Sequence, residues 1–260
     1  MHGLSATFYN DATLYETIAA ELESHGWGFA LFNNRGHDLI AGIRKMDSTP
    51  LNGYSYFPGG AGSEVFEQST FDIEAGIDFL VSEGFSEVVV VGHSTGANKA
   101  CYFAATQNNP HVIGVVLSGP MSDRLDPLVD AEKRNKHLLY MHEQIEKGNG
   151  DTLFFGYHFF PMTPKRYISL FQRGSLEDVF DYGDEDPKMT FFSTIQIPLM
   201  VLLGGKDEYA DRPMGDIKKV FDAHATAKKY SSIIIADALH KFHGKEKEVA
   251  GAITSWIAGI

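Results

Sequence analysis

Two patterns of hydrophobic residues alternate along the chain. Short continuous apolar runs are typical of buried strands, and apolar residues at helical spacing are typical of helices with one apolar face. The segment "EVVVVG" at 87–92 is a continuous β-branched run, which is typical of a strand covered on both faces in a parallel sheet. Similar runs predict four further strands, which are "GFALFNN" at 28–34, "VIGVVLSG" at 112–119, "IPLMVLLGG" at 197–205 and "SSIIIAD" at 231–237. This pattern favours a mostly parallel, doubly wound α/β sheet.

Amphipathic segments between these runs predict the helices that cover the sheet. In the first, over about 11–25, Leu14, Ile18 and Leu22 fall four residues apart on one face. The others lie over about 64–83, near 217–224 and at the end of the chain, where Val249, Ile253, Trp256 and Ile257 share one stripe. We therefore expect residues 1–120 and 191–260 to form one core.

Residues 121–190 interrupt this alternation between two predicted core strands. The segment is longer than a crossover needs, and it contains the aromatic cluster "LFFGYHFFP" at 153–161. Because ligands bind at the carboxyl ends of the strands in open α/β sheets, we expect this insertion to form a helical cap or lid there. Phe155, Tyr157 and Phe159 are then expected to line a substrate pocket; the alternative is that they pack only the small core of the segment itself.

Composition and charge narrow the classes of function. Of the 260 residues, 43% are hydrophobic and 22% are charged, as is usual for a globular protein. The formal net charge of −12 disfavours non-specific binding to nucleic acid or anionic membranes. No apolar run reaches the roughly 18 residues needed to span a bilayer. The single cysteine, Cys101, excludes an internal disulfide and suits a reducing, cytoplasmic compartment; its expected place is inside a buried helix.

The strongest chemical signal is "GHSTG" at 92–96, which matches the G-x-S-x-G pattern. It lies between a predicted buried strand and a predicted helix, where a tight turn lifts the Ser94 hydroxyl clear of the sheet. Such a turn is strained, so its neighbours must be small, as Gly92 and Gly96 are. The helix start offers the Thr95 N–H to a developing oxyanion. These features predict Ser94 as a nucleophile, with His93 beside the substrate pocket.

A serine nucleophile needs a base, and the base needs an acid that orients it. In sheets with this motif, the acid and then the base follow the serine along the chain. Asp207 follows the predicted strand at 197–205, and His240 follows the one at 231–237, so we predict Asp207 as the acid and His240 as the base. The alternatives are Glu208, Asp211 and the more distant Asp123 for the acid, and His243 for the base.

The remaining histidines and glycines give no sign of a metal or a cofactor. No histidine has metal-ligand spacing with cysteine or carboxylate partners, so a zinc site is not expected. No phosphate-binding glycine pattern follows a predicted strand, so no nucleotide cofactor is implied. His37 lies in the loop "NNRGHD", where we expect it to brace the loop by hydrogen bonds with Arg35 and Asp38.

Four segments in this order, "FNNRGHD", "GHSTGA", "LLGGKDEY" and "ALHKFHGKEKEVAGAITSWI", resemble the α/β-hydrolase superfamily across nearly the whole chain. The segment "PMTPKRYISLFQRGSLEDVFDYGDED" is similar to a branch that includes fungal esterases acting on fusarinine-type siderophores. The superfamily resemblance implies Ser94 as nucleophile, Asp207 as acid and His240 as base.

The same resemblance implies an oxyanion hole formed by the backbone N–H groups of Thr95 and of Leu4, which follows His2-Gly3. The expected reaction is acyl transfer from a small-molecule ester to water without a cofactor, and thioesters, lactones and amides are open alternatives. A hydrolase-fold protein that binds a ligand without useful turnover is an alternative from another class, although it has no need of all three residues in catalytic order. The sequence leaves the substrate and the oligomeric state open.

The beginning of the chain departs from the superfamily pattern. In that pattern the strand leading into His2-Gly3 lies at the centre of the sheet, between the strands predicted at 28–34 and 87–92, and one or two more strands precede it. The sequence begins with "MHGL" and contains none of them. We therefore expect it to lack an N-terminal segment of roughly one to three strands; the alternative is a natural minimal variant.

Overall fold

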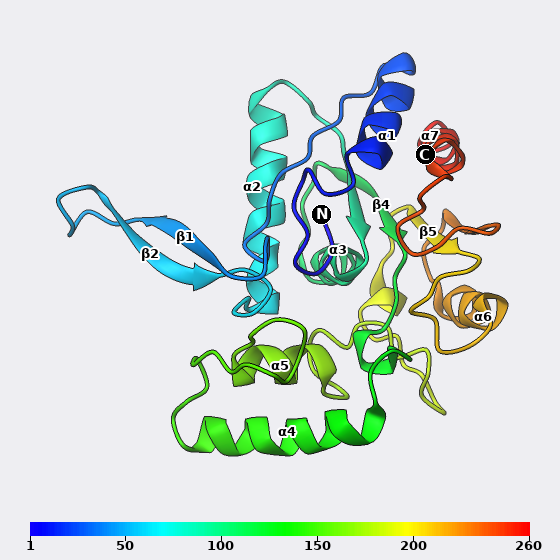
Figure 1. Ribbon diagram of the computed structural model, residues 1–260. Helices are drawn as coiled ribbons and strands as arrows, with labels where there is room; N and C mark the ends of the chain where they lie inside the picture. Colours follow the sequence, from blue (N-terminus) through cyan, green and yellow to red (C-terminus); the bar gives the residue numbers. More distant parts are fainter.

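A parallel four-stranded sheet forms the centre of the molecule, as Figure 1 shows in a computed structural model that describes residues 1–260. In spatial order its strands are β3 (Val88–His93), β4 (Val112–Ser118), β5 (Leu199–Gly204) and β6 (Tyr230–Ile235). Each strand pairs in parallel with its neighbour, so the carboxyl ends of all four lie at one edge of the sheet. Four of the five strands predicted from apolar runs are confirmed.

Helices cover both faces of this sheet. One face carries α2 (Ser69–Ser82), α3 (Thr95–Thr106) and α6 (Met214–His224), and the other carries α1 (Ala12–Ser24) and α7 (Glu246–Ile257). Single turns of 3₁₀ helix occur at η1 (Phe66–Gln68), η2 (Asp123–Leu125) and η3 (Phe192–Thr194). The helices predicted from amphipathic spacing are therefore confirmed. Their ends differ from the prediction by a few residues at most, except that the predicted start at about 64 precedes α2 and is followed by the 3₁₀ turn η1.

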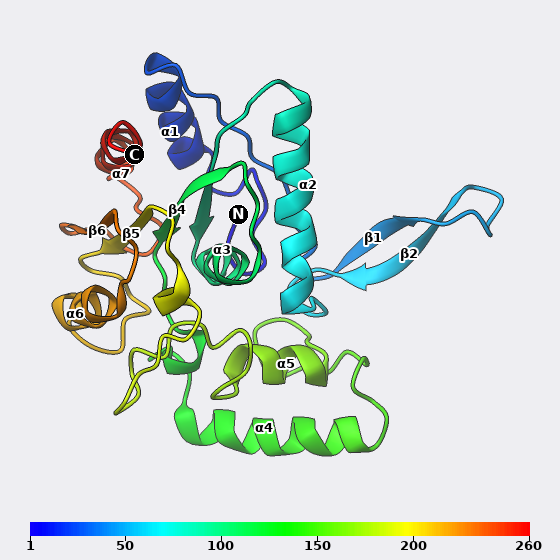
Figure 2. The same cartoon turned by 180° about the vertical axis from the view of Figure 1, so that it is seen from behind.

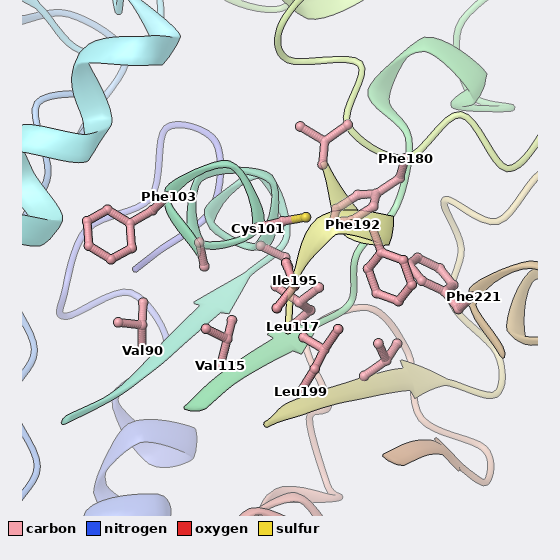
Figure 3. Packing of buried hydrophobic residues seen from close by; sticks show 14 of the residues in the cluster. Val90, Cys101, Phe103, Val115, Leu117, Phe180, Phe192, Ile195, Leu199 and Phe221 are labelled. Carbon is pink, nitrogen blue, oxygen red and sulfur yellow. The ribbon is translucent and has the colours of Figure 1, made fainter. Parts of the chain in front are cut away.

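The two faces of the sheet belong to two separate cores because successive residues of a strand point in opposite directions. In β4, Val115 and Leu117 enter the larger core under α2, α3 and α6, whereas Val116 enters the smaller one under α1 and α7. Figure 3 shows the larger core, where Cys101 of α3 lies among the strands and a group of phenylalanine rings. Cys101 is thus buried in a helix, as predicted.

The predicted cap segment contains two helices that lie side by side, α4 (Ala131–Glu146) and α5 (Pro164–Phe171), on one side of the sheet (Figures 1 and 2). They share a small apolar cluster with Ala61, made of Met141, Phe160, Met162, Tyr167, Leu170 and Phe171. Further along, Val179, Phe180, Tyr182 and Met189 return to the larger core. The segment therefore has a core of its own and is also anchored in the main one.

A two-stranded antiparallel hairpin that the sequence analysis does not predict projects away from the body in Figures 1 and 2. It consists of β1 (Ala41–Met46) and β2 (Tyr54–Gly59), with Met46 paired to Tyr54 beside the turn. The signal that indicates it is Asn52-Gly53, a turn dipeptide between two short runs, with Gly53 at a φ of 74°.

The prediction of a strand at 28–34 is wrong. Residues 27–34 form no regular element, and the backbone of Gly28–Asn33 takes part in no hydrogen bond within the protein. A strand exists only where a neighbouring strand lies within hydrogen-bonding reach, and the nearest edge, that of β3, is separated from this segment by an apolar groove lined by both. The apolar composition of 28–34 therefore led to a wrong prediction of a buried, paired strand, since only Asn34 of these residues is buried.

A buried charge cluster, which we define as Glu64, Lys99, Arg166 and Glu177, joins the cap to the core. The Lys99 ammonium lies 2.5 Å from Glu64, and the Arg166 guanidinium contacts both Glu64, at 3.5 Å, and Glu177. All four side chains are almost completely inaccessible. Burial alone raises the pKa of Glu64, but Lys99 and then Arg166 outweigh it and hold that pKa below its ordinary value. The cluster therefore links α3, α5 and the residues before α2 through contacts between oppositely charged side chains.

Removing one member of the buried charge cluster should destabilise the protein strongly, because its partners are left as uncompensated buried charges. We expect Arg166→Met to lower the free energy of unfolding by about 3–5 kcal/mol. The matched control is Lys165→Met, one residue earlier in α5, whose exposed pair with Asp151 should contribute less than about 1 kcal/mol. Urea denaturation measures both, and equal losses in the two variants would contradict the role of the cluster.

Candidate active site

The turn after β3 holds Ser94 in a strained backbone conformation, with a φ of 58° and a ψ of −130°. Left-handed φ values of this kind are uncommon for residues with side chains and persist only where the surroundings impose them. The two flanking glycines show how tightly the turn is packed. A Cβ added to Gly92 would lie 2.2 Å from the carbonyl oxygen of Gly96, and one added to Gly96 would lie 2.4 Å from that of Met1. Only glycine therefore fits at these two positions.

The N-terminal loop at His2-Gly3 lies directly against this turn. A Cβ on Gly3 would approach the Ser94 Cβ to 2.7 Å and its Oγ to 3.1 Å. The buried His2 ring holds the loop, because its Nε2 accepts a hydrogen bond from the Asn34 N–H at 3.2 Å and its Nδ1–H donates to the Gly3 carbonyl at 3.0 Å. Burial lowers the pKa of His2 to about 4, so this neutral tautomer persists at neutral pH. The loop thus brings Leu4 beside Ser94.

Beyond the ends of β5 and β6, at the same edge of the sheet as Ser94, Asp207 and His240 form a buried pair. The His240 Nδ1 lies 2.7 Å from Asp207 Oδ2, and the Asp207 side chain is completely inaccessible. The other carboxylate oxygen of Asp207 accepts a hydrogen bond from the Tyr209 N–H at 3.0 Å. Because a carboxylate only accepts hydrogen bonds, a neutral His240 carries its ring proton on Nδ1. Its Nε2 is then left as a hydrogen-bond acceptor.

Two further side chains, which the sequence analysis does not assign to this role, fix the backbone of His240. Glu208 accepts a hydrogen bond from the His240 N–H at 2.9 Å, and the His93 Nε2–H donates to the His240 carbonyl at 2.9 Å. Burial, followed by the neighbouring His240, lowers the pKa of His93 to about 4, so this ring stays neutral. The histidine at the variable position of "GHSTG" is the signal in the sequence that indicates this contact.

An open cavity of about 1220 Å³ brings the predicted site residues together. Ser94, His240 and Leu4 line it, as does His93. Its other lining includes the polar side chains of Asn10, Asp11, Ser122, Asp123, Asp126, Tyr209 and Lys241, beside apolar ones such as Met121. Asp207 lies behind His240 and does not reach the surface of the cavity.

The cap contributes fewer aromatic residues to this cavity than expected. Phe159 lines it, but Phe155 and Tyr157 do not. Tyr157 stacks on Tyr140 of α4 with ring centroids 5.2 Å apart, and the side chain of Phe155 is exposed. Besides Phe159, the cap residues that line the cavity are Met121, Ser122, Asp123, Asp126, His158, Leu170 and Phe171. Gly156, between Phe155 and Tyr157, has a left-handed φ of 83°, and a count of aromatic residues does not reveal such a change in chain direction.

The alternative acids and base lie elsewhere. Glu208 contacts the backbone of His240 instead of its ring, and Asp211 pairs with Arg212. His243 is exposed and lies 3.4 Å from Asp11. Asp123 lines the cavity but makes no hydrogen bond to His240. The geometry thus favours the pair of Asp207 and His240 over each alternative.

The carboxyl of Asp123 lies in an environment that disfavours its charge. Burial, and after it the nearby Glu177, raises the pKa of Asp123 to about 8. The pKa of Asp126, on the same wall of the cavity, is also raised, mainly by burial. At neutral pH Asp123 is therefore mostly protonated and offers the cavity a hydroxyl donor.

The loop around His37 has the expected neighbours in part. His37 Nδ1 lies 2.8 Å from Asp38 Oδ2, but Arg35 turns to α2, where it forms a pair with Asp72 at 2.9 Å. No group of three or more histidine, cysteine or carboxylate side chains is arranged to hold a metal ion. No helix has the length and apolar character needed to cross a membrane.

A family model described as "Protein of unknown function (DUF1749)" matches residues 51–258. The chain belongs to this family. No curated protein matches it significantly.

Several solved structures resemble the DUF1749 chain over almost its whole length. One is a monoacylglycerol lipase of Paleococcus ferrophilus, with a TM-score of 0.65 and 16% identity over 100% of this chain and 92% of that one. Another is Est1E from Butyrivibrio proteoclasticus with ferulic acid bound, with a TM-score of 0.63 and 13% identity over 100% and 86%. A monoglyceride lipase from Saccharomyces cerevisiae, in complex with a substrate analog, has a TM-score of 0.64 and 14% identity over 98% and 83%. The chain therefore has the α/β-hydrolase fold.

The raised pKa of Asp123 predicts how stability depends on pH. Its folded-state pKa of about 8 exceeds the ordinary value of 3.8, so this carboxyl opposes folding increasingly as the pH rises from 4 to 8. We expect Asp123→Asn to raise the free energy of unfolding at pH 8 by roughly 1–3 kcal/mol and to change it little near pH 4.

Urea denaturation at the two pH values checks this, with Asp78→Asn on the exposed surface of α2 as the matched control. The control should change the free energy of unfolding equally little at both. An Asp123→Asn effect of the same size at pH 4 and pH 8 would contradict the assignment of a protonated Asp123.

Proposed function

We propose that this protein is a serine hydrolase that cleaves a carboxylic ester of a small molecule through an acyl-enzyme intermediate. The observation that carries the proposal is the shared cavity of Ser94, on its strained turn, and His240, whose Nδ1 is bonded to the buried Asp207. The fold is that of proteins described as lipases and esterases, which supports the same class of reaction. No cofactor is required for it.

In the proposed reaction, His240 Nε2 takes the Ser94 proton as the hydroxyl oxygen attacks the ester carbonyl. Asp207 stabilises the resulting imidazolium without taking a proton from it. The alcohol leaves with the proton from His240, and the acyl group stays on Ser94. Water, deprotonated by the same histidine, then attacks the acyl-enzyme and releases the acid, which restores Ser94.

Backbone N–H groups of Thr95 and Leu4 are proposed to hold the oxyanion. Thr95 is the first residue of α3, where the N–H groups of a helix start have no intrahelical partners and attract negative charge. The Leu4 N–H makes no hydrogen bond within the protein, and Gly3 beside it touches Ser94. Both donors are thus free to face the developing charge, which is the arrangement that stabilises a tetrahedral intermediate.

The cavity favours a substrate with polar groups. Asp123, protonated at neutral pH, is able to donate a hydrogen bond, and Lys241 lies 3.3 Å from Asp11 on the same wall. A hydrocarbon chain laid along this wall would bury the Asp123 hydroxyl without a partner, at a cost of about 1–3 kcal/mol. We therefore propose an ester whose acid or alcohol part carries hydroxyl or amino groups.

Loss of the nucleophile should abolish both turnover and covalent labelling. We expect Ser94→Ala to bind no fluorophosphonate probe and to lose at least about 10³-fold in kcat for short p-nitrophenyl esters. The matched control is Ser122→Ala, which removes a hydroxyl from the same cavity and should retain labelling.

Labelling that survives in Ser94→Ala would overturn the assignment of the nucleophile. If the unaltered protein hydrolyses no ester yet is stabilised thermally by ester analogues, a ligand-binding role replaces the enzymatic one.

Glu208 is a positioning residue in this scheme, because it acts through the His240 backbone. We expect Glu208→Ala to lower kcat about 10- to 100-fold with little change in KM, since His240 is no longer held in line with Ser94. Glu208→Gln keeps an oxygen acceptor for the His240 N–H and should restore most of the rate.

The control for this prediction is Asp211→Ala, three residues later, whose carboxylate pairs with Arg212 and not with His240. Thermal denaturation verifies that all three variants are folded. Equal loss of kcat in Glu208→Ala and Glu208→Gln would contradict positioning through a hydrogen bond.

A further inference from the structure

Two surfaces outside the candidate active site carry exposed aromatic side chains on the same side of the molecule. One is the hairpin of β1 and β2, which leaves the molecule near the start of α2 in Figures 1 and 2. The other is the outward side of α2, which faces away from the sheet in both views. The proposed hydrolysis uses neither of them.

The hairpin receives no support from the rest of the protein beyond its base. No residue from 41 to 58 is buried, and the hydrogen bonds of these residues are formed within the hairpin. A two-stranded hairpin on its own is only marginally stable in water. A partner that packs on the hairpin would supply the support that the chain itself does not.

One side of the hairpin, which we call the hairpin face, combines aromatic rings with a cation. The register places Arg44 opposite Tyr56 and Met46 opposite Tyr54, so these four side chains point to one side. The Arg44 guanidinium lies over the Tyr54 ring, 4.8 Å from its centroid, and the two tyrosine rings meet edge to face. Met46 is 86% exposed and Tyr56 is 60% exposed, so a partner has access to this face.

The outward side of α2 carries a matching row, which we call the α2 strip. It consists of Glu67, Phe71, Ala75, Phe79 and Glu83, which follow one another at intervals of four residues along one side of the helix and its ends. Phe71 is 65% exposed, although Arg35 approaches its ring, and Phe79 is 57% exposed. No lysine or arginine occurs between residues 60 and 98, so this part of the chain is purely acidic.

The hairpin face and the α2 strip are complementary in charge and in apolar character. The hairpin carries Arg44 and Lys45 against a single acid, Asp47, whereas the whole chain has a net charge of −12. Copies of so acidic a chain repel each other at a distance, so their association needs a local contact between opposite charges. Aromatic residues, methionine and arginine are also the side chains enriched at protein interfaces.

We propose that the hairpin face of one copy of this protein packs on the α2 strip of a second copy, in a two-fold dimer that contains two such contacts. Within one chain the hairpin points away from α2, so the two surfaces do not meet (Figures 1 and 2). A two-fold axis makes the exchange reciprocal and closes the assembly at two copies. A lipid surface would cover the hairpin face but leave Phe71 and Phe79 exposed, whereas a second copy covers both surfaces at once.

Sedimentation velocity of the full chain tests the proposal, and we expect the unaltered protein to be a dimer at about 10 μM. Arg44→Glu with Lys45→Glu makes the hairpin acidic, and Glu67→Lys with Glu83→Lys makes the strip basic. Each pair of substitutions should raise the dissociation constant of the dimer at least about 10-fold, because like charges then face each other.

The matched controls lie on the exposed surface of α4 and change the net charge by the same amounts. They are Lys136→Glu with Lys147→Glu for the hairpin variant, and Glu132→Lys with Glu143→Lys for the strip variant. Both should leave the dissociation constant unchanged. Circular dichroism verifies that all the variants are folded.

Mixing the hairpin variant with the strip variant distinguishes this contact from any other. In a mixed pair the acidic hairpin meets a basic strip, and the basic hairpin of the other copy meets an acidic strip. The mixture should therefore form dimers at a concentration where neither variant does so alone.

A monomeric unaltered protein, a dimer that survives both pairs of substitutions, or a mixture that stays monomeric would each overturn the proposal. Flotation of the monomer with phosphatidylcholine vesicles would also overturn it, because lipid would then occupy the hairpin face. Since no readout involves hydrolysis, these outcomes are independent of the result for Ser94.

Discussion

The close approach of three backbone segments around Ser94 is the constraint on which the rest of the site depends. The end of β3, the start of α3 and the N-terminal loop meet there at distances that exclude any side chain at Gly3, Gly92 and Gly96. The same contact creates the strain at Ser94 and brings Leu4 to the cavity. A strained turn persists only where its surroundings impose it. The orientation of the Ser94 hydroxyl therefore depends on the close packing at these glycines.

Much of this arrangement follows from the sequence, because it depends on local patterns. Continuous apolar runs indicate β3 to β6, and helical spacing indicates the helices on both faces. Residues that follow the strands of a parallel sheet must meet at one edge, so Ser94, Asp207 and His240 were expected near one another from their positions alone. The pairing of Asp207 with His240, in preference to Glu208 or Asp211, needed the geometry, since all three carboxylates lie within one short loop.

What the sequence analysis missed depends on contacts between distant segments. Residues 28–34 have the composition of a buried strand, yet pairing requires an edge within reach, and no local pattern reports that distance. Phe155 and Tyr157 belong to one aromatic cluster with Phe159 but point to different neighbours, because the turn at Gly156 separates them. His93 and Glu208 bond to the backbone of His240, which is distant from both in the sequence. Residue type alone does not indicate such contacts.

The buried charge cluster has a consequence for how this protein can diverge or be redesigned. Lys99 lies in α3, about one helical turn after Ser94, and its charge is balanced by Glu64, which in turn contacts Arg166 of the cap. Exchanging the cap for a segment without Arg166 and Glu177 leaves Glu64 and Lys99 buried without half of the charges that surround them. The segment 121–190 and α3 are therefore coupled through these charges, and an exchange of that segment must keep all four charged residues or replace all of them with apolar ones at once.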